Sequence, residues 1–310
     1  MPRISVIIPT YNRAHYICET INSVLEQTYK DYEIIVIDDG STDNTKKVLK
    51  GYDGKIRYLY QNNKGTPAAR NFGINNSTGE FIGLLDDDDL WLPNKLELQV
   101  KELEKNPELA FICSSTYIID SCGKNIGQWG EKISIFGTFN DLYEENIVYN
   151  LTVLMRRKCF NDVGGYDEKL LSCQDYDLWL RMAKKYKFYY MAVPLTKHRK
   201  HDSNFGKNIS LRLQNHLNIF NKIYISKSVS FLKRKIRIAK EFYKSGAAYY
   251  SNKNYFNASI CYLKAIIVYP LIGYYFWPKE IRKVRFTFIY RIAIAYFLLV
   301  KCLFKCIKDM

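Results

Sequence analysis

The stretch Glu80–Pro93, EFIGLLDDDDLWLP, decides the fold. Its apolar run, residues 81–85, predicts a buried strand, and four consecutive aspartates, Asp86 to Asp89, follow it directly. Adjacent carboxylates repel one another, so a fold that gathers them at the end of a buried strand needs a compensating cation. Oxygen ligands of this kind suit Mg²⁺ or Mn²⁺ better than zinc. The alternative is a solvated acidic loop that caps a helix beginning near Pro93.

Strand and helix patterns alternate upstream of this stretch. The strand patterns cover residues 3–12, 32–37 and 56–60, and the helix patterns cover 15–27, 44–49 and 65–75. This alternation predicts a parallel α/β sheet. In such sheets ligands bind beyond the carboxyl ends of the strands. Polar residues follow three of the strands at those ends, and they are Thr10-Tyr11-Asn12, Asp38-Asp39 and the four aspartates. The sequence therefore predicts one active-site crevice at this edge.

Two common nucleotide motifs are missing from the sequence. No GxGxxG follows the first strand and no GxxxxGK[ST] is present, which disfavours a dinucleotide-binding fold and a P-loop NTPase. A diphosphate in the crevice would then be held by a metal ion and side chains. Eight scattered cysteines without CxxC pairs predict reduced thiols rather than a zinc site or a disulfide framework. The chain opens directly into an apolar strand, so we expect no signal peptide.

The second part of the chain continues the α/β pattern up to about residue 200. The expected elements are a helix at 95–106, a strand at 110–115, a hairpin turn at 121–124, a strand at 151–155, a helix at 172–186 and a strand at 188–193. Asp175 falls in the first turn of the helix at 172–186. Residues 126–148 are too irregular to assign.

The basic residues concentrate in the last third of the chain. Residues 1–205 carry 26 Lys and Arg against 28 Asp and Glu, whereas residues 206–310 carry 20 against 3, a net charge of +17. Helix patterns at 210–224 and 235–269 predict an all-helical extension. Residues 286–304 are mostly apolar but contain Arg291 and Lys301, so a membrane span is not certain.

A lysine stripe points to a membrane surface. Lys301, Lys305 and Lys308 lie opposite Leu299, Cys302, Leu303 and Phe304, which is typical of an interfacial helix on anionic lipid, and Tyr269, Tyr274, Tyr275 and Trp277 suit the headgroup level. We expect an anionic membrane as partner and no nucleic acid. The alternative is a helix packed on the rest of the protein.

Six segments resemble glycosyltransferase family 2, whose members are inverting, metal-dependent enzymes with the nucleotide-diphospho-sugar (GT-A) fold. They occur in the order and spacing of the family across roughly residues 3–205, and are SVIIPTYNR, IDDGSTDNT, GTPAARNFG, FIGLLDDDDLWLP, VGGYDE and QDYDLWLR. The resemblance implies a mostly parallel central sheet flanked by helices. It divides the chain into a GT-A domain at 1–205, with a nucleotide-binding half at 1–109 and an acceptor half at 110–205, and a basic helical tail at 206–310.

The resemblance also implies residue roles. Pro9, Thr10 and Tyr11 would line the base pocket, Asp39 would accept a hydrogen bond from uracil, and Arg70 would approach the phosphates. Asp86 and Asp88 match the outer members of the DxD motif, with Asp88 as the direct ligand of Mg²⁺ or Mn²⁺ and Asp87 nearer the ribose or donor sugar. Asp175 matches the catalytic base. The segment HRKHDSN (198–204) resembles the closing motif, which makes His201 a further candidate metal or diphosphate ligand.

The chemistry of sugar transfer requires two of these roles. Inversion needs a base that takes the proton of the acceptor hydroxyl, and a Lewis acid that stabilises the departing diphosphate. Structural alternatives exist for each residue: Asp39 as a helix cap, Asp175 as a charge serving the helix dipole, Arg70 as a simple ion-pair partner. One departure is Gln174, because the family usually has Glu before the catalytic Asp.

The expected function is an inverting hexosyl- or N-acetylhexosaminyltransferase. It would move a sugar from a UDP-sugar to a lipid-linked or polysaccharide acceptor in cell-surface glycan synthesis, from the cytoplasmic side of the membrane. The alternatives are a sugar nucleotidyltransferase, which usually carries a glycine- and Arg/Lys-rich triphosphate loop that TYNRAHY lacks, and a non-catalytic scaffold that binds membrane or nucleic acid through the tail.

Overall fold

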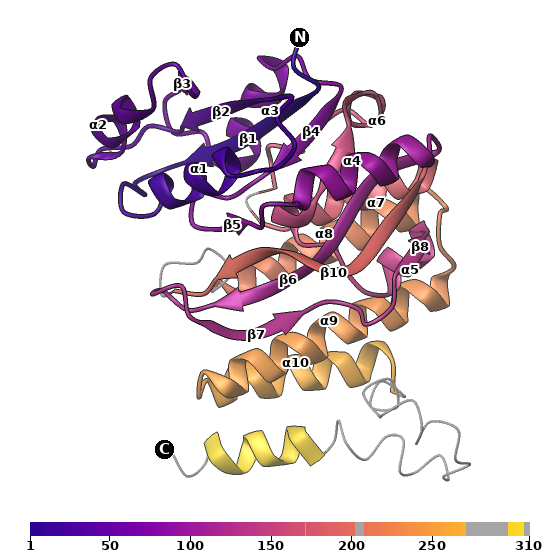
Figure 1. The fold of residues 1–310 in the computed structure, drawn as a ribbon. Helices are drawn as coiled ribbons and strands as arrows, with labels where there is room; N and C mark the ends of the chain where they lie inside the picture. The colour runs from indigo at the N-terminus through magenta and orange to yellow at the C-terminus, as the bar shows by residue number, and fades with distance from the viewer. Residues whose placement is uncertain (171, 202–207, 271–296, 307–310) are drawn as a thin grey trace. The chain divides into compact units, whose positions relative to one another are not determined.

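The computed structural model describes all residues except 171, 202–207, 271–296 and 307–310 (Figure 1). The chain forms two compact units, residues 1–204 and 205–310. The division lies one residue before the boundary predicted from the change in charge and motif content.

The first unit begins with alternating strands and helices, as the sequence pattern predicts. The elements are β1 (Ile4–Thr10), α1 (Ile17–Leu25), β2 (Tyr32–Asp38), α2 (Thr45–Leu49), η1 (Lys50–Tyr52), β3 (Arg57–Tyr60), α3 (Thr66–Asn75) and β4 (Phe81–Leu84). β1 lies between β2 and β4 and is parallel to both, and β3 is parallel to β2. All residues of β1 and β4 are buried. Strands covered on both faces read as continuous apolar runs, which explains why the sequence pattern was clear here.

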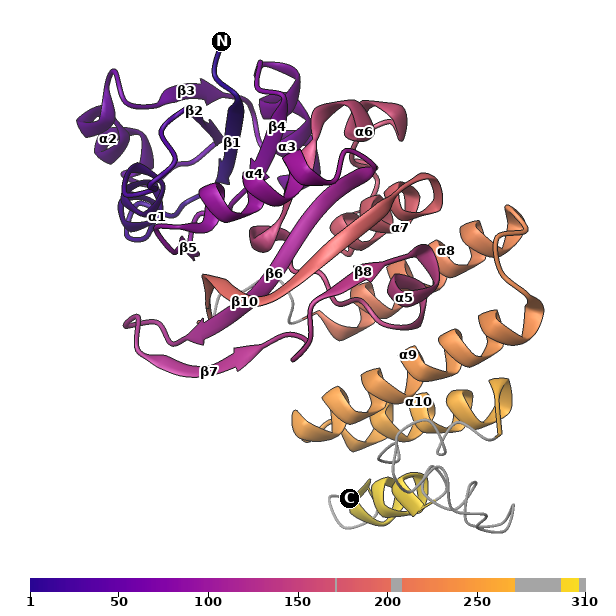
Figure 2. The same ribbon diagram turned by 45° about the vertical axis from the view of Figure 1, so that its right-hand side comes forward.

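The second half of this unit adds the remaining strands. The elements are β5 (Leu90–Trp91), α4 (Lys95–Lys105), β6 (Leu109–Ile119), β7 (Asn125–Trp129), β8 (Ile135–Gly137), α5 (Phe139–Glu144), η2 (Asn150–Thr152), β9 (Leu154–Arg156), α6 (Arg157–Asp162), α7 (Gln174–Lys185) and β10 (Lys187–Arg199). β6 and β10 are parallel and run side by side in both views (Figures 1 and 2). β9 joins the halves, because it is antiparallel to both β4 and β6.

One mixed sheet results, with the strand order β3-β2-β1-β4-β9-β6-β10-β5, β7 added to β6 and β8 added to β10. The predicted α/β class with a central sheet flanked by helices is confirmed. Parallel pairing is confined to β3-β2-β1-β4 and to β6-β10, whereas β5, β7, β8 and β9 pair antiparallel. The unassigned residues 126–148 contain most of β7, all of β8 and α5.

The strand predicted at 151–155 begins later than expected. Thr152 donates hydrogen bonds to the Tyr149 carbonyl oxygen from its backbone N, at 3.0 Å, and from Oγ1, at 2.7 Å. These bonds close a short 3₁₀ turn, η2, and the extended conformation therefore starts only at Leu154.

The second unit contains α8 (Ile209–Ile225), α9 (Phe231–Ser251) and α10 (Tyr255–Val268). Asn208, Ser230 and Asn254 cap these helices, because each side chain accepts a hydrogen bond from the backbone N–H three residues later. α9 and α10 form the predicted helical hairpin and run side by side (Figure 1).

Residues 297–306 are also helical. Leu298 and Leu299 pack against side chains of α9 and α10, and the buried Cys302 contacts the same cluster as Tyr262. None of the helices in the described part of the chain is long and apolar enough to cross a membrane.

The lysine stripe predicted on this last helix is arranged differently from the expectation. Lys305 Nζ lies 4.8 Å from the ring centres of both Tyr250 and Tyr255, and Lys301 Nζ lies 5.7 Å from that of Tyr250. Cation–π contacts thus hold these lysines over rings of the hairpin. The exposed side chains include Phe297 and Phe304, which are 64% and 65% exposed. Lys308, Tyr274, Tyr275, Trp277 and most of 286–304 lie outside the described residues.

Candidate active site

The loops that follow β1 and β2 interlock at the carboxyl edge of the sheet. Asn12 Oδ1 accepts hydrogen bonds from the backbone N of Thr42, at 2.7 Å, and of Asp43, at 3.2 Å. The Asn12 backbone N donates to Ser41 Oγ at 2.9 Å, and Asn12 has a φ of 55°, a left-handed conformation that Asn tolerates. The TYN and DGSTD segments therefore build one rim. Pro9 and Thr10 are buried beneath it, and Tyr11 is 44% exposed.

Asp39 organises the loop before α3. Its carboxylate accepts hydrogen bonds from Gln61 Nε2 at 2.6 Å, from the Lys64 backbone N at 2.9 Å and from the Gly65 backbone N at 2.8 Å. Gly40 allows this approach, because a Cβ at that position would stand 2.8 Å from the Asn63 backbone N. The Asp39 backbone N donates to the Thr10 carbonyl oxygen at 2.9 Å, which places this residue beside the β1 rim. Asp39 does not act as a cap of α2.

The four aspartates fall into two pairs of different surroundings. Asp86 and Asp87 are half-buried, and Asp88 and Asp89 are buried. Asp87 accepts a hydrogen bond from the Tyr11 backbone N at 3.3 Å and lies 3.8 Å from Arg13 Nε. Burial and the neighbouring Asp88 raise the pKa of Asp87 to about 8. The four carboxylates therefore lie close together, and the positively charged side chains of the protein compensate their negative charge only in part.

The end of β10 crosses the aspartate cluster. His201 Nε2 lies 2.7 Å from Asp88 Oδ2, and His198 Nδ1 lies 3.1 Å from Asp89 Oδ1. Arg199 donates from Nε to the Asp88 carbonyl oxygen at 2.9 Å and from its backbone N to Asp89 Oδ1 at 2.8 Å. Thus His201, predicted as a candidate ligand, does reach Asp88. His198 and Arg199 fix the conformation of the aspartate cluster through these contacts with Asp88 and Asp89.

The aspartate cluster has the donor chemistry of a Mg²⁺ or Mn²⁺ site. Within the described residues, no three His, Cys, Asp or Glu side chains gather as a ready ligand set. Mg²⁺ is commonly bound through one or two carboxylates, with substrate phosphates and water completing the shell. Asp88, with Asp86 on the same turn, fits this requirement, because hard oxygen donors crowd there and their mutual repulsion falls when a cation binds.

Arg70 connects the aspartates with the predicted base. Arg70 is 4% exposed, its Nη2 lies 2.5 Å from Asp86 Oδ1, and its guanidinium lies 5.5 Å from the ring centre of Tyr166. Its Nε and Nη1 atoms are buried without a hydrogen-bond partner among the described residues. Buried donors of this kind favour a ligand that accepts from them.

Asp175 stands in the first turn of α7, after Cys173, which has a left-handed φ of 61°. Burial raises the pKa of Asp175, and the charge of Arg70 opposes that rise. Asp86 also acts on the pKa of Asp175. Asp175, Arg70 and Asp86 therefore share one electrostatic environment, although they come from three distant parts of the sequence.

The VGGYDE turn holds these parts together. Asn71 on α3 donates from Nδ2 to the Tyr166 carbonyl oxygen and accepts from the Tyr166 backbone N, both at 3.0 Å. Arg181 on α7 donates to the carbonyl oxygens of Val163 and Gly165, both at 2.6 Å. The turn thus ties the helix of Arg70 to the helix of Asp175.

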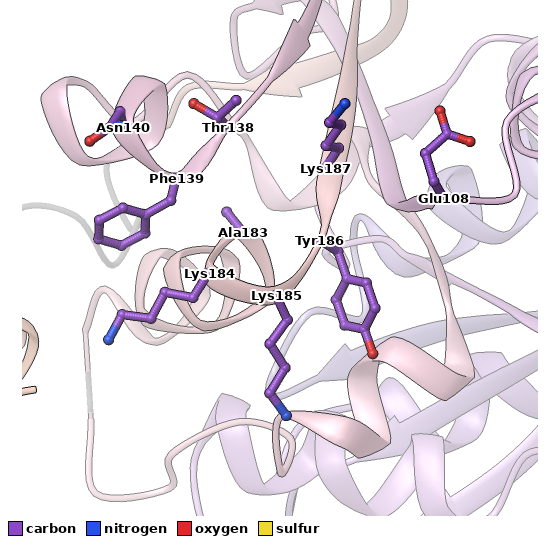
Figure 3. Close-up of a pocket in the computed structure, with 9 residues that line it drawn as sticks. All are labelled: Glu108, Thr138, Phe139, Asn140, Ala183, Lys184, Lys185, Tyr186 and Lys187. Carbon is purple, nitrogen blue, oxygen red and sulfur yellow. The ribbon is translucent and has the colours of Figure 1, made fainter. Parts of the chain in front are cut away.

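A separate hollow of about 480 Å³ lies at the other end of α7 (Figure 3). Its lining residues include none of the predicted site residues, and they are Glu108, Thr138, Phe139, Asn140, Ala183, Lys184, Lys185, Tyr186 and Lys187. The hollow is therefore not the predicted crevice.

Sequence patterns missed Tyr149 and the role of His198. Tyr149 precedes η2, between the unassigned residues 126–148 and the strand predicted at 151–155, and its ring centre lies 5.2 Å from that of His198. The charges of Asp89 and Asp175 contribute, after burial, to a raised pKa of Tyr149. The HRKH segment was the only available indication of this part of the site.

Residues 5–164 match the family described as Glycosyl transferase family 2. The chain belongs to this family. The match covers the β1, β2, α3 and β4 segments and ends in the VGGYDE turn, so it includes all predicted site residues except Asp175 and His201.

Several curated glycosyltransferases are similar to this chain. An uncharacterized glycosyltransferase of Rickettsia conorii is 38% identical over 216 residues, 67% of this chain and 35% of that protein. Another, from Rickettsia typhi, is 36% identical over 213 residues, 65% of each chain. The Escherichia coli UDP-Glc:alpha-D-GlcNAc-diphosphoundecaprenol beta-1,3-glucosyltransferase WfgD is 37% identical over 183 residues, 58% of this chain and 70% of WfgD. The chain thus spans between about a third and two thirds of the length of the Rickettsia relatives.

Solved structures show the same fold and confirm the GT-A expectation for this family 2 chain. Staphylococcus aureus TarS (residues 1–349), in complex with UDP-GlcNAc, has a TM-score of 0.66 at 18% identity, with 97% of this chain and 89% of that chain covered. The mannosyltransferase PcManGT of Pyrobaculum calidifontis, in complex with GDP-Man and Mn²⁺, has a TM-score of 0.59 at 18% identity, with 99% and 88% covered.

Proposed function

We propose that the chain is an inverting glycosyltransferase that moves a hexosyl or N-acetylhexosaminyl group from a UDP-sugar to a lipid-linked or polysaccharide acceptor. The observation that carries the proposal is the environment shared by Arg70, Asp86 and Asp175 beside the interlocked loops after β1 and β2. Membership in family 2 and the UDP-sugar named for WfgD support the donor class.

The nucleotide would bind along the rim formed by the loops after β1 and β2. Thr10 and Tyr11 would contact the base from one side, and Asp39 would accept from the uracil N–H, since one lone-pair position of its Oδ2 is not used by the loop donors described above. Asp87 would contact the ribose or the donor sugar. The Nε and Nη1 donors of Arg70, which have no hydrogen-bond partner among the described residues, would donate to a phosphate oxygen.

In the proposed transfer, an acceptor hydroxyl oxygen forms a bond to the anomeric carbon while the bond from that carbon to the diphosphate oxygen breaks. The electron pair leaves with UDP, and the hydroxyl proton moves to an Asp175 carboxylate oxygen. A divalent ion held by Asp88, with Asp86 and His201 as further candidate ligands, would stabilise the charge on the leaving diphosphate. Arg70 would keep Asp175 ionised, because a nearby positive charge favours the carboxylate form.

The tail would bring this site to a membrane-bound acceptor. Residues 206–310 carry a net charge of +17, and Phe297 and Phe304 are exposed on the last described helix. Basic charge combined with exposed aromatic side chains favours an anionic lipid surface. We propose peripheral attachment to the inner face of the cell membrane and no nucleic-acid partner.

The test of the enzyme is UDP release from a panel of UDP-sugars by the purified chain, with and without EDTA. We expect turnover of at least one donor, loss of turnover in EDTA and recovery with excess Mg²⁺ or Mn²⁺. Turnover that survives chelation would remove the metal role of Asp88, and pyrophosphate release from a sugar phosphate and UTP would support a nucleotidyltransferase instead.

The test of the tail is flotation of the full chain with vesicles, either neutral or containing anionic lipid. We expect binding to anionic vesicles only, and weaker binding after Phe297→Ser with Phe304→Ser. Ile126→Ser is a matched control, because Ile126 is equally an exposed apolar side chain but belongs to β7. Equal flotation of all variants would exclude the aromatic contribution, and a gel shift with nucleic acid instead of flotation would overturn the proposed partner.

A further inference from the structure

An aromatic wall stands beside the catalytic carboxylates, and none of the predicted site residues belongs to it. The ring of Trp129 meets that of Tyr149 edge-on, with 4.2 Å between ring centres and an interplanar angle of 87°. The ring of Tyr149 lies 5.2 Å from that of His198, tilted by 36°. These three residues, Trp129, Tyr149 and His198, are here called the aromatic wall. They come from the end of β7, the turn before η2 and the end of β10.

The aromatic wall is anchored on one side, because Tyr149 packs against the main hydrophobic core. The Tyr149 carbonyl oxygen accepts two hydrogen bonds from Thr152, and His198 Nδ1 is held 3.1 Å from Asp89 Oδ1. Trp129 and Tyr149 are nevertheless only half-buried. A rigid aromatic surface that remains partly exposed next to a catalytic group is typical of a ligand site rather than of a core.

Tyr149 links the aromatic wall to the proposed chemistry. Its ring lies 5.2 Å from that of His198, and His198 Nδ1 lies 3.1 Å from Asp89 Oδ1 in the aspartate cluster. The charges of Asp89 and Asp175 also raise the pKa of Tyr149, after the larger effect of burial. The Tyr149 hydroxyl forms no hydrogen bond within the described part of the chain, whereas the buried Tyr166 and Tyr176 hydroxyls donate to Asn150 Oδ1 and to the Leu142 carbonyl oxygen. A half-buried tyrosine hydroxyl usually has a partner, and a bound ligand would supply one.

We propose that the aromatic wall is the acceptor subsite, in which Trp129 stacks on a pyranose ring of the acceptor and the Tyr149 hydroxyl hydrogen-bonds to it. The inference rests on the proposed function and specifies its acceptor. A pyranose presents an apolar C–H face and polar edges, which match an indole ring beside a phenol hydroxyl.

The placement favours the acceptor over the donor. The nucleotide half of the site is formed by the loops after β1, β2 and β4, and Trp129 and Tyr149 both come from residues 110–205. The base must touch the acceptor hydroxyl. Tyr149 is joined to the aspartate cluster from the acceptor half, through His198, which lies 3.1 Å from Asp89 Oδ1. A sugar held on the aromatic wall would therefore present its hydroxyl to Asp175.

Two activities of the full chain separate acceptor from donor effects. Hydrolysis of the UDP-sugar by water reports on the donor, and transfer to a panel of alkyl pyranosides and alkyl-diphospho-pyranosides reports on the acceptor. For Trp129→Ala we expect the acceptor KM to rise about tenfold, equivalent to ~1.4 kcal/mol, with hydrolysis and the donor KM unchanged. Trp129→Phe should recover most of the loss, and Tyr149→Phe should raise the acceptor KM roughly threefold through one lost neutral hydrogen bond.

Phe136→Ala is the matched control, because Phe136 is an exposed aromatic residue on β8 whose ring lies near Tyr189 and not near the aromatic wall. It should leave the acceptor KM unchanged. If Trp129→Ala lowers hydrolysis and transfer equally, or changes neither, the acceptor subsite is overturned while the enzyme stands. If the wild type hydrolyses a UDP-sugar but transfers to no pyranoside, the subsite is overturned as well. If the wild type turns over no UDP-sugar at all, the proposed function itself fails.

Discussion

Buried and half-buried carboxylates in the two units of the chain have opposite pKa shifts. In the first unit, burial raises the pKa of Asp175, and burial with neighbouring aspartates raises that of Asp87 and Asp89. In the second unit, Glu241 is also buried, yet its pKa is held well below the ordinary value because Arg237 and His216 outweigh the effect of burial.

The contrast separates carboxylates that the protein compensates fully from carboxylates that it compensates only in part. Glu241 Oε2 lies 2.8 Å from His216 Nδ1, and Oε1 is paired with Arg237 on the same helix. Its charge is therefore satisfied within the protein, and it joins α8 to α9. The aspartates of the first unit are left with less compensation, which is the condition that favours binding of a cation and transfer of a proton.

The largest effect is expected at Asp175. Asp175→Asn removes the proposed base while keeping shape and size, and should lower the rate of transfer about 10²- to 10⁴-fold. UDP binding, measured by calorimetry, should remain, because the nucleotide rim is made by other residues. Asp177→Asn is a comparison on the same turn: Asp177 pairs with Arg181 at 2.7 Å, and Arg181 holds the VGGYDE turn, so this change should affect stability more than the rate of proton transfer. Full transfer activity in Asp175→Asn would end the role of this residue as base.

The next largest effect is expected at Glu241, whose charge is paired within the protein. Glu241→Gln should destabilise the second unit by about 3–5 kcal/mol, because it leaves the buried Arg237 without its counter-charge. Thermal unfolding followed by circular dichroism measures the change. A variant as stable as the wild type would show that Glu241 contributes no net stability.

The stabilising contribution of Glu241 should depend on pH. Since the folded-state pKa of Glu241 is lowered from 4.5, its contribution is present above that value and is lost as the pH falls through the lower folded-state pKa. The stability difference between the wild type and Glu241→Gln should therefore shrink below about pH 4.5. A difference that stays constant down to pH 2 would contradict the ion pair.

The rate of sugar transfer should also depend on pH, but here the pKa of the carboxylate, Asp175, is raised rather than lowered. A general base acts in its ionised form, so the acid limb of kcat/KM should lie above 3.8, the ordinary value for Asp, because the pKa of Asp175 is raised. Arg70→Met should move this limb to still higher pH, since the charge that favours the carboxylate is gone. An acid limb at or below 3.8 would place the base elsewhere.

The smallest effect is expected at the buried amine of Lys95. Lys95 is fully buried, with Nζ 2.7 Å from Gln99 Oε1 and 3.9 Å from the ring centre of Trp91, and burial lowers its pKa. Lys95→Met conserves volume and removes a group that is costly to bury, so it should raise stability by less than about 1.5 kcal/mol. The gain should shrink toward pH 10, where the unfolded-state lysine loses its charge too. A large loss of stability in Lys95→Met would show that the amine is needed.

The sequence predicted the elements of the sheet well where burial is two-sided. β1, β2 and β4 appear as apolar runs with few interruptions, and their boundaries lie within a few residues of the predicted ones. It failed at residues 126–148, because β7 is exposed along most of its length and shows no alternation, and β8 is only three residues long. It also could not show that the terminal lysines contact Tyr250 and Tyr255.

The candidate site also has a part that the sequence predicted and a part that it could not predict. The motifs named Asp86, Asp88 and Asp175, because these residue types follow strand ends or begin a helix with characteristic neighbours. They could not show that His201 reaches Asp88 or that the ring of Tyr149 lies against that of His198, since these contacts join residues 113 and 49 positions apart in the sequence.

The sequence alone thus determined the family, the order of strands and helices and the carboxylates at the edge of the sheet, since apolar periodicity and residue type are local properties of the chain. Only the tertiary structure decided which carboxylates are compensated and which aromatic rings stand next to them. Burial and charge coupling set those properties, and both depend on which distant segments the fold brings into contact.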